Sequence, residues 1–344
     1  MAPSTPSPAM PEADSPETPV DEFDWIQRCL MPLAAGTPEA LGLLDDAAVV
    51  RSRPGFDLVI SKDAIVEGIH FLPDDPLDAV ARKLLRVNLS DLAAKGAEPY
   101  GYLLAVAWAR RHGWPEREAF AKGLAEDQQR FGLHLLGGDT VSTPGPLTAS
   151  LTILGWAPEG RMVRRANAQV GDLVLVTGAI GDGFLGLEAA GGGLAGLGDR
   201  EKAYLADRYR IPQPRLELGS ALRDWASAAA DVSDGLIADA GRIALASQVR
   251  LDLDLDLIPL SPSAGLWLAA QVDQDAARLQ LAGGGDDYEV ICTASETAAS
   301  ELERAAKTLG LRLTRIGRVK AGQGVDTRLG GRLVSAPSAG YRHG

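Results

Sequence analysis

The sequence predicts an α/β (α+β) protein with two domains, and three observations indicate this. At 344 residues the chain is long enough for two domains of ordinary size. Short apolar runs, several of them rich in β-branched residues, alternate with longer runs whose apolar residues follow helical spacing. This alternation stops in a basic stretch without a strand pattern, residues 161–172, and then resumes. We therefore expect domains at 21–160 and 161–344, after a Pro-rich tail over residues 1–20 that is expected to be disordered.

The first half is expected to form a mixed sheet with flanking helices. Apolar runs, the last rich in Thr, Ser and Ile, predict strands at 57–61, 102–108, 133–136 and 147–156. Leucines at helical spacing after Pro76 predict a helix over 76–95, and a second helix is predicted over 115–131.

The second half is expected to be a layered α/β domain of similar type. Strands are predicted at 172–178, 249–257, 288–293 and 311–319, and helices at 183–190, 200–209, 215–228, 235–247 and 295–309. The segment 249–257 alternates strictly between Leu and Asp from Leu251 onward, which is typical of a half-buried strand. Its acidic residues, Asp252, Asp254 and Asp256, are therefore expected to form a solvated face.

Composition excludes several classes of function. The chain has 34 basic and 46 acidic residues, a net charge of −12, which argues against nucleic acid or an anionic membrane as a partner. The two cysteines lie in no C-x-x-C spacing, so neither a disulfide framework nor a zinc site is indicated. No window of 18 uninterrupted apolar residues occurs, and residues 2–20 resemble no signal peptide. We expect a cytoplasmic protein.

Short acidic clusters are the main functional signal. Most of them lie beside Gly, Ser or Thr at the end of an apolar run: Asp45-Asp46, Asp63, Asp91, Asp139, Asp231 with Asp234, and Asp286-Asp287. Carboxylates at strand ends and turns suit hard cations, because Mg²⁺ takes a few carboxylates and completes its shell with phosphate and water. The pattern predicts a metal-dependent phosphate enzyme.

Each motif alone leaves an ordinary structural alternative open. The run D-V-S-D-G-L at 231–236 fits either a phosphate and metal site at a helix start or a plain N-cap. G-G-D-T at 137–140 fits a ligand site or a strand-end turn, and Arg161, Arg164 and Arg165 fit phosphate binding or surface ion pairs. G-D-G-F-L-G at 181–186 satisfies G-x-G-x-x-G, but no strand with a terminal acidic residue follows, which favours a helix-start turn.

Read in order, the motifs resemble those of a known family. They are L-D-D-A-A at 44–48, S-K-D-A-I-V-E-G-I-H-F at 61–71, N-L-S-D-L-A-A-K-G-A-E-P at 88–99, G-G-D-T, D-V-S-D-G-L, and G-G-G-D-D-Y-E at 283–289. Over about residues 22–343 the chain is similar to the thiamine-monophosphate kinases, whose superfamily includes aminoimidazole ribonucleotide synthetase and selenophosphate synthetase. The resemblance implies a homodimer in which two N-terminal halves pair into a barrel-like core, with the active site between the domains.

The resemblance also implies the reaction and the roles of individual residues. ATP would phosphorylate thiamine monophosphate to thiamine diphosphate by direct in-line transfer, assisted by several Mg²⁺ ions and without a covalent nucleophile. The implied Mg²⁺ ligands are Asp46, Ser61, Asp63, Asp91, Asp139, Asp231 and Asp234. The implied ATP contacts are Gly138, Asp139, Arg165 and Ser233, and the implied substrate contacts are His70, Asp286 and Tyr341.

The chain departs from the family pattern at three positions. Leu44 replaces a Gly, Lys62 stands where Thr is common, and Asp286 replaces a Glu.

The alternative functions are another ATP-dependent synthetase of the same superfamily, or a non-catalytic regulator that binds nucleotide and metal.

Overall fold

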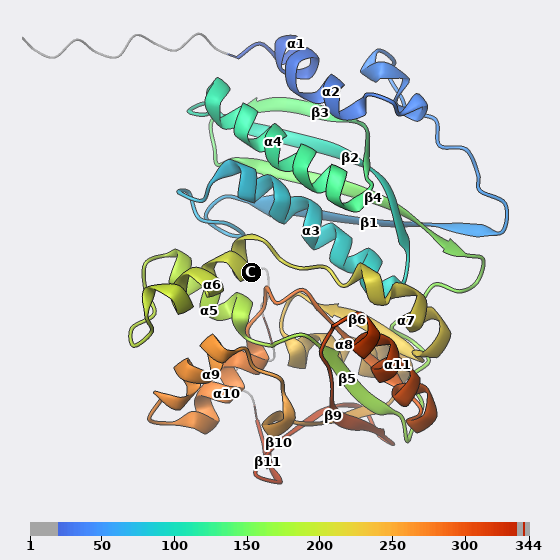
Figure 1. Cartoon of the computed structure of the whole chain (residues 1–344), viewed down its shortest axis with the longest axis vertical. Coiled ribbons are helices and arrows are strands. Elements are labelled where there is room, and N and C mark those ends of the chain that lie inside the picture. Colours follow the sequence, from blue (N-terminus) through green and yellow to red (C-terminus); the bar gives the residue numbers. More distant parts are fainter. Residues whose placement is uncertain (1–19, 336–339, 341–344) are drawn as a thin grey trace, which may run out of the picture.

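Two β-sheets organise the chain, each with its own hydrophobic core (Figure 1). This computed structural model describes residues 20–335 and residue 340. The first sheet has the order β1-β4-β2-β3 and consists of β1 (Phe56–Val66), β2 (Glu98–Ala109), β3 (His134–Thr143) and β4 (Thr148–Pro158). Strands β2 and β3 pair in parallel and the other pairs are antiparallel, which confirms the predicted mixed sheet.

Two long helices, α3 (Leu77–Lys95) and α4 (Trp114–Phe131), cover one face of this sheet (Figure 1). Helix α3 also contacts strands of the second sheet, so it lies between the two halves. Its leucines Leu84, Leu85, Leu89 and Leu92 are fully buried, because a helix between two sheets has no wide solvent face. Short helical segments precede β1: α1 (Glu22–Trp25), η1 (Ile26–Leu30), α2 (Met31–Ala34) and η2 (Pro38–Leu43).

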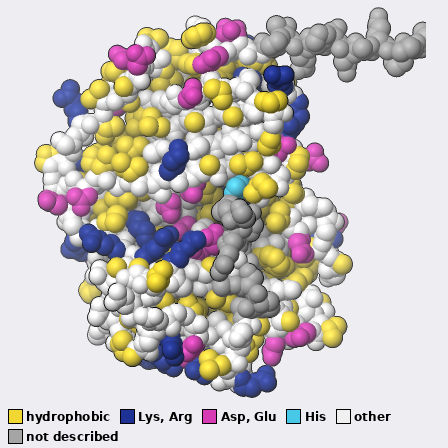
Figure 2. Space-filling model, turned by 180° about the vertical axis from the view of Figure 1, so that it is seen from behind, with side chains coloured by type: hydrophobic (Ala, Val, Ile, Leu, Met, Phe, Trp, Pro, Cys, Tyr) yellow, Lys and Arg dark blue, Asp and Glu magenta, His cyan; other side chains and the backbone are white. Residues whose placement is uncertain are grey.

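The opposite face of the first sheet is exposed in the single chain. Leu58, Ile60, Leu103 and Val141 project from three of its strands, and Ile60 and Val141 are 59% and 53% exposed. Figure 2 shows hydrophobic side chains gathered over the half of the molecule that holds this sheet. An apolar sheet face of this kind is typical of an interaction surface.

The second sheet has the order β11-β10-β7-β9-β5-β8-β6. Its strands are β5 (Leu173–Thr177), β6 (Ala228–Val232), β7 (Arg250–Asp254), β8 (Glu289–Ala294), β9 (Leu313–Lys320), β10 (Gly324–Leu329) and β11 (Arg332–Val334). The helical segments of this half are α5 (Asp182–Ala190), α6 (Asp199–Arg210), η3 (Leu216–Leu218), α7 (Gly219–Trp225), α8 (Leu236–Ser247), η4 (Leu255–Leu257), α9 (Pro262–Ala269), α10 (Gln274–Gly283) and α11 (Glu296–Thr308). The mixed α/β content agrees with the predicted fold class.

The predicted solvated face on β7 is wrong at Asp252. This carboxylate is only 8% exposed, accepts a hydrogen bond from Arg328 Nε at 2.8 Å and pairs with Lys320. The strand also ends at Asp254, whose side chain caps η4 by accepting from the Asp256 amide. Leu–Asp alternation correctly predicted a strand, but it could not reveal the cations that β9 and β10 place beside Asp252.

Within the part of the chain that the structure describes, no helix is long and apolar enough to cross a membrane.

Candidate active site

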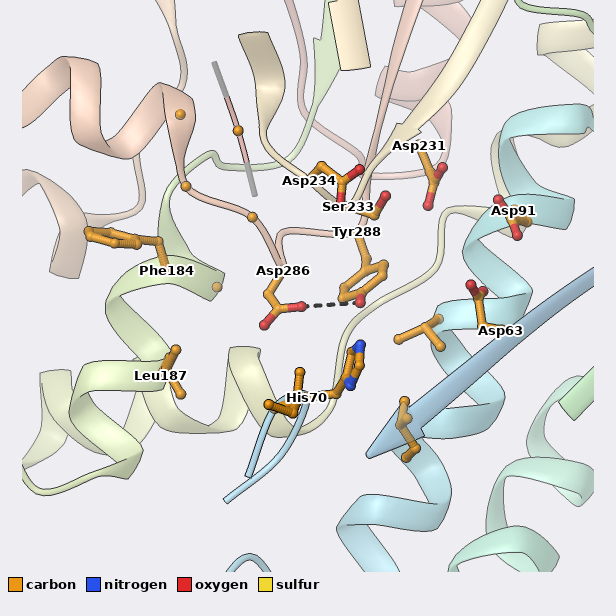
Figure 3. A pocket seen from close by; sticks show the side chains of 18 of the residues that line it. Asp63, His70, Asp91, Phe184, Leu187, Asp231, Ser233, Asp234, Asp286 and Tyr288 are labelled. Atoms are coloured by element: carbon orange, nitrogen blue, oxygen red, sulfur yellow. Dashed lines mark hydrogen bonds between the residues drawn. The ribbon is translucent and has the colours of Figure 1, made fainter. Parts of the chain in front are cut away.

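A cavity of about 840 Å³ lies between the two halves and collects most of the acidic motifs (Figure 3). The first half contributes Asp63 from β1, His70 from the following loop, and Asp91 from α3. The second half contributes residues from the end of β6 and from the loop before β8, namely Asp231, Ser233, Asp234, Asp286 and Tyr288. These residues span more than 200 positions of the sequence, yet they line one space.

Strand alternation and one helix place the acidic residues of the first half. Ser61 and Asp63 lie on the same face of β1, toward α3, and the Ser61 hydroxyl donates a hydrogen bond to the Asp91 carboxylate. One turn before Asp91, the Asn88 side chain accepts the Asp63 backbone N–H at 3.0 Å. The N-L-S-D motif therefore anchors the strand and supplies a carboxylate.

The carboxylates of the cavity repel one another. Burial, together with the charges of Asp91 and Asp234, raises the pKa of Asp63 to about 6. Burial and the charge of Asp91 raise the pKa of Asp231 well above its usual value. Such an arrangement is typical of a site that binds cations, because a bound cation offsets both the cost of burying the carboxylates and their mutual repulsion.

The D-V-S-D-G loop is held from inside the helix that follows it. Asp239 of α8 accepts the backbone N–H groups of Ser233 and Asp234, each at 3.0 Å, and Arg242 pairs with the Asp234 carboxylate. The amides of these two residues, which precede α8, are thus bound by protein. The N-cap of α8 is Gly235, without a side-chain capping bond, so the alternative of a plain Asp or Ser N-cap is wrong.

The second acidic loop packs directly against the first. The Asp286 N–H donates to the Ser233 carbonyl at 2.9 Å, and the Tyr288 N–H donates to the Val232 carbonyl at 2.8 Å. Gly285 permits this approach, because a Cβ there would lie 2.5 Å from the Ser233 carbonyl oxygen. The Asp286 side chain accepts the Tyr288 hydroxyl at 3.1 Å and faces the cavity (Figure 3).

Asp287 has a buried structural role that sequence reasoning missed. Its carboxylate accepts the backbone N–H groups of Gly181 and Gly183 at 2.8 and 2.9 Å. The G-D-G-F-L-G run therefore starts α5, as predicted, and two of its amides bind a carboxylate of the protein. Nothing in the polar run D-D-Y-E distinguishes Asp287 from Asp286, so the sequence held no signal for this role.

The cavity is polar at one end and apolar at the other. Asp63, Asp91 and Asp231 lie at one end in Figure 3, whereas Phe184 and Leu187 lie at the opposite end. His70 and Asp286 lie between these ends. The ring of His70 is oriented by its Nδ1, which accepts the Val66 N–H at 3.1 Å.

Three other predicted residues lie around a second, smaller cavity. Asp46, Gly138 and Asp139 line a space of about 350 Å³ beside β3. By strand alternation Asp139 lies on the exposed face of the sheet with Leu103 and Val141, opposite the face that carries Asp63. A single chain thus divides the predicted metal ligands between two cavities.

Strand pairing by itself explains why position 138 is a glycine. A Cβ at this position would lie 1.7 Å from the Leu104 carbonyl oxygen, so glycine is needed for β3 to pair with β2.

Four other residues singled out from the sequence fall outside both cavity linings, namely Leu44, Ser61, Lys62 and Arg165. Arg165 lies near the acidic end: the burial of Lys95 and, to a lesser extent, the charge of Arg165 lower the pKa of Lys95 to about 8. Leu44 has an ordinary φ of −106°, so the backbone needs no glycine there, and Lys62 is exposed. Tyr341 lies outside the described residues.

The cavity carboxylates form only part of a metal site. Among residues 20–335 and 340, no three His, Cys, Asp or Glu side chains form a complete metal site by themselves. The carboxylates with raised pKa values nevertheless fit Mg²⁺, which characteristically takes one or two carboxylates and fills its shell with phosphate and water.

Comparisons with known proteins identify the family of the chain. Residues 44–157 match the N-terminal domain model of AIR synthase related proteins, and residues 169–330 match the C-terminal domain model. The thiamine-monophosphate kinase of Caulobacter vibrioides is 51% identical over 356 aligned residues, covering 100% of each chain.

Two solved structures extend the comparison. The crystal structure of thiamine-monophosphate kinase from Stenotrophomonas maltophilia K279a is 37% identical, with a TM-score of 0.79 over 90% of this chain and 97% of that one. AaThiL complexed with AMPPCP and TMP is 26% identical, with a TM-score of 0.73 over 92% of this chain and 95% of that one. The chain therefore belongs to the thiamine-monophosphate kinase family.

Proposed function

We propose that the protein uses ATP to phosphorylate thiamine monophosphate, giving thiamine diphosphate and ADP. The observation that carries this proposal is the division of the 840 Å³ cavity into a carboxylate end and an apolar end (Figure 3). The carboxylate end suits metal-bound phosphates, and the apolar end suits an organic ring system. The relative complexed with AMPPCP and TMP supports the same pair of substrates.

The residues that would hold several Mg²⁺ ions are carboxylates that line the two cavities, together with the Ser61 hydroxyl, which donates a hydrogen bond to one of them. They are Asp46, Ser61, Asp63, Asp91, Asp139, Asp231 and Asp234. When bound, Mg²⁺ supplies positive charge that neutralises the phosphates of both substrates. The protein's net charge of −12 makes that supply necessary.

The transfer itself needs no covalent nucleophile from the protein. A terminal phosphate oxygen of thiamine monophosphate attacks the γ-phosphorus of ATP, the bond to the β-phosphate oxygen breaks, and ADP leaves. Such a transfer depends mainly on positioning and on charge neutralisation. The residues assigned to ATP are Gly138, Asp139, Arg165 and Ser233, and those assigned to thiamine are His70, Asp286 and Tyr341.

We further propose that the protein works as a homodimer. Residues 21–160 would form the domain that binds ATP and Mg²⁺ and dimerises, and residues 161–344 would complete the active site. Pairing through the exposed face of the first sheet would bury Ile60 and Val141. It would also cover the face that carries Asp139, so the smaller cavity of one copy would serve the larger cavity of the other.

The test is ADP release by the purified protein with thiamine monophosphate, ATP and Mg²⁺. Turnover is expected, and a chelator should abolish it. Asp139→Asn should abolish turnover while the circular dichroism spectrum stays unchanged, and Asp207→Asn, at an exposed position on α6, should behave as wild type. No turnover by the wild-type protein would overturn the proposal.

A further inference from the structure

A buried lysine lies directly behind the part of the cavity assigned to thiamine. Lys83 of α3 is 2% exposed, although lysine is almost never fully buried without a partner. It precedes the N-L-S-D motif by more than one helical turn and belongs to none of the acidic motifs. The motifs therefore do not explain Lys83, but its contacts do.

Lys83 joins three segments that are distant in sequence. Its Nζ donates a hydrogen bond to the His70 carbonyl at 2.9 Å and lies 3.5 Å from Oδ2 of Asp286. The same nitrogen lies 3.5 Å from the ring centroid of Tyr209 on α6, and the Tyr209 hydroxyl donates to the same His70 carbonyl at 3.2 Å.

The contact with Lys83 holds the Asp286 carboxylate at the wall of the cavity. The Asp286 side chain keeps 31% of its surface exposed, so one carboxylate edge meets Lys83 and the rest faces the cavity. The backbone of Asp286 is left-handed, with φ of 67°, a conformation that a non-glycine residue keeps only when its surroundings hold it there. Lys83 is one of those surroundings.

Packing alone does not account for a lysine at this position. Burial lowers the pKa of Lys83, and the carboxylates of Asp286 and Asp75 oppose that shift. An apolar side chain such as methionine would fill the same space without the cost of burying an ammonium group. The cost of burying the ammonium group is offset only by its contacts with the His70 carbonyl and the Asp286 carboxylate.

We propose that Lys83 is a positioning residue for the thiamine part of the substrate, acting through the Asp286 carboxylate and the His70 carbonyl. The inference rests on the proposed function. The Asp286 carboxylate, fixed at the cavity wall, would meet the cationic and hydrogen-bond-donating ring system of thiamine. The ATP phosphates would bind at the other end of the cavity, away from Lys83.

The experiment compares KM values for the two substrates in Lys83→Met. We expect KM for thiamine monophosphate to rise about tenfold or more, as for loss of a buried charged hydrogen bond, while KM for ATP stays within about twofold. In the Asp286→Asn background the same substitution should have a smaller effect, because the carboxylate partner has already lost its charge and only the contact with the His70 carbonyl remains to be lost.

The structural control is Arg86→Met, three residues further along α3. Arg86 is buried and paired with Asp127, away from the cavity lining, so its loss should lower the melting temperature and leave the two KM values unchanged. If Lys83→Met does not fold, Lys83→Gln retains a donor toward His70 without the charge and replaces it in the comparison.

The outcomes separate the two hypotheses. If the wild-type enzyme does not turn over thiamine monophosphate, the proposed function fails and this inference fails with it. Turnover by the wild type, combined with equal changes in both KM values, no change in either, or additivity with Asp286→Asn, overturns the role of Lys83 alone.

Discussion

At the scale of single residues, adjacent aspartates of one motif have opposite environments. Asp286 faces the cavity, whereas Asp287 is 1% exposed and binds the turn that starts α5. The sequence could predict that this motif is functional, because carboxylates beside glycines suit metal and phosphate chemistry. It could not predict which carboxylate is buried, or that Lys83 contacts one of them, since those partners lie far away along the chain.

The raised pKa of Asp63 leads to a prediction about stability without metal. In the unfolded chain this carboxyl loses its proton near its ordinary pKa of 3.8, but in the folded protein it does so at about 6. The folded state therefore binds more protons between these values, so stability falls as pH rises through this window and stays lower above it.

Asp63→Asn should consequently stabilise the protein at pH 8 in chelator, by about 2–3 kcal/mol at most, and abolish its kinase activity. Below pH 4 the difference in stability should vanish. Urea unfolding at pH 4, 6 and 8 measures it, with Asp207→Asn as the exposed control. A loss of stability at pH 8 in Asp63→Asn would contradict the assigned electrostatics.

At the scale of elements, α3 connects the two halves and carries residues for both folding and the site. Its helical pattern was predictable, because Pro76 precedes it and Gly96, with φ of 64°, ends it. Strand β6 was not predicted, and its first residue, Ala228, lies at the end of the predicted helix 215–228. Its sequence, A-A-A-D-V, has a single β-branched residue, and only pairing with β8 makes it a strand.

A buried ion pair holds α3 against α4. Arg86 Nε lies 2.5 Å from Asp127 Oδ2, both side chains are at most 1% exposed, and Arg86 Nη1 also donates to the Pro212 carbonyl at 2.9 Å. Asp127→Asn would leave an unpaired guanidinium in the interior and should cost about 3–5 kcal/mol of unfolding free energy.

Urea unfolding followed by circular dichroism measures that cost. The matched control is Glu118→Gln, which breaks the surface pair of Arg28 and Glu118, 56% and 53% exposed, and should change stability by less than about 1 kcal/mol. Equal effects of the two substitutions would mean that the buried pair does not hold the helices together.

At the scale of the whole molecule, the two cavities of a single chain are the reason for proposing a dimer. Asp63 and Asp139 lie on opposite faces of the same sheet. Side chains on opposite faces cannot converge within one chain, but a second copy docked on the exposed face can bring its Asp139 to the first copy's Asp63. The strand registers show directly that the two residues lie on opposite faces, whereas the order of the motifs in sequence suggested one continuous site.

Mixed dimers test whether the site is shared between copies. Asp63→Asn and Asp139→Asn should each be inactive alone. After denaturation and refolding together, half of the dimers would be mixed, and each mixed dimer would contain one intact site, so about a quarter of wild-type activity should return. The control mixes Asp63→Asn with Asp91→Asn, both in the larger cavity, and should recover nothing because every site then carries one defect. Ultracentrifugation must show dimers in both mixtures. Dimers without recovery in the first mixture would mean that Asp63 and Asp139 act within one chain.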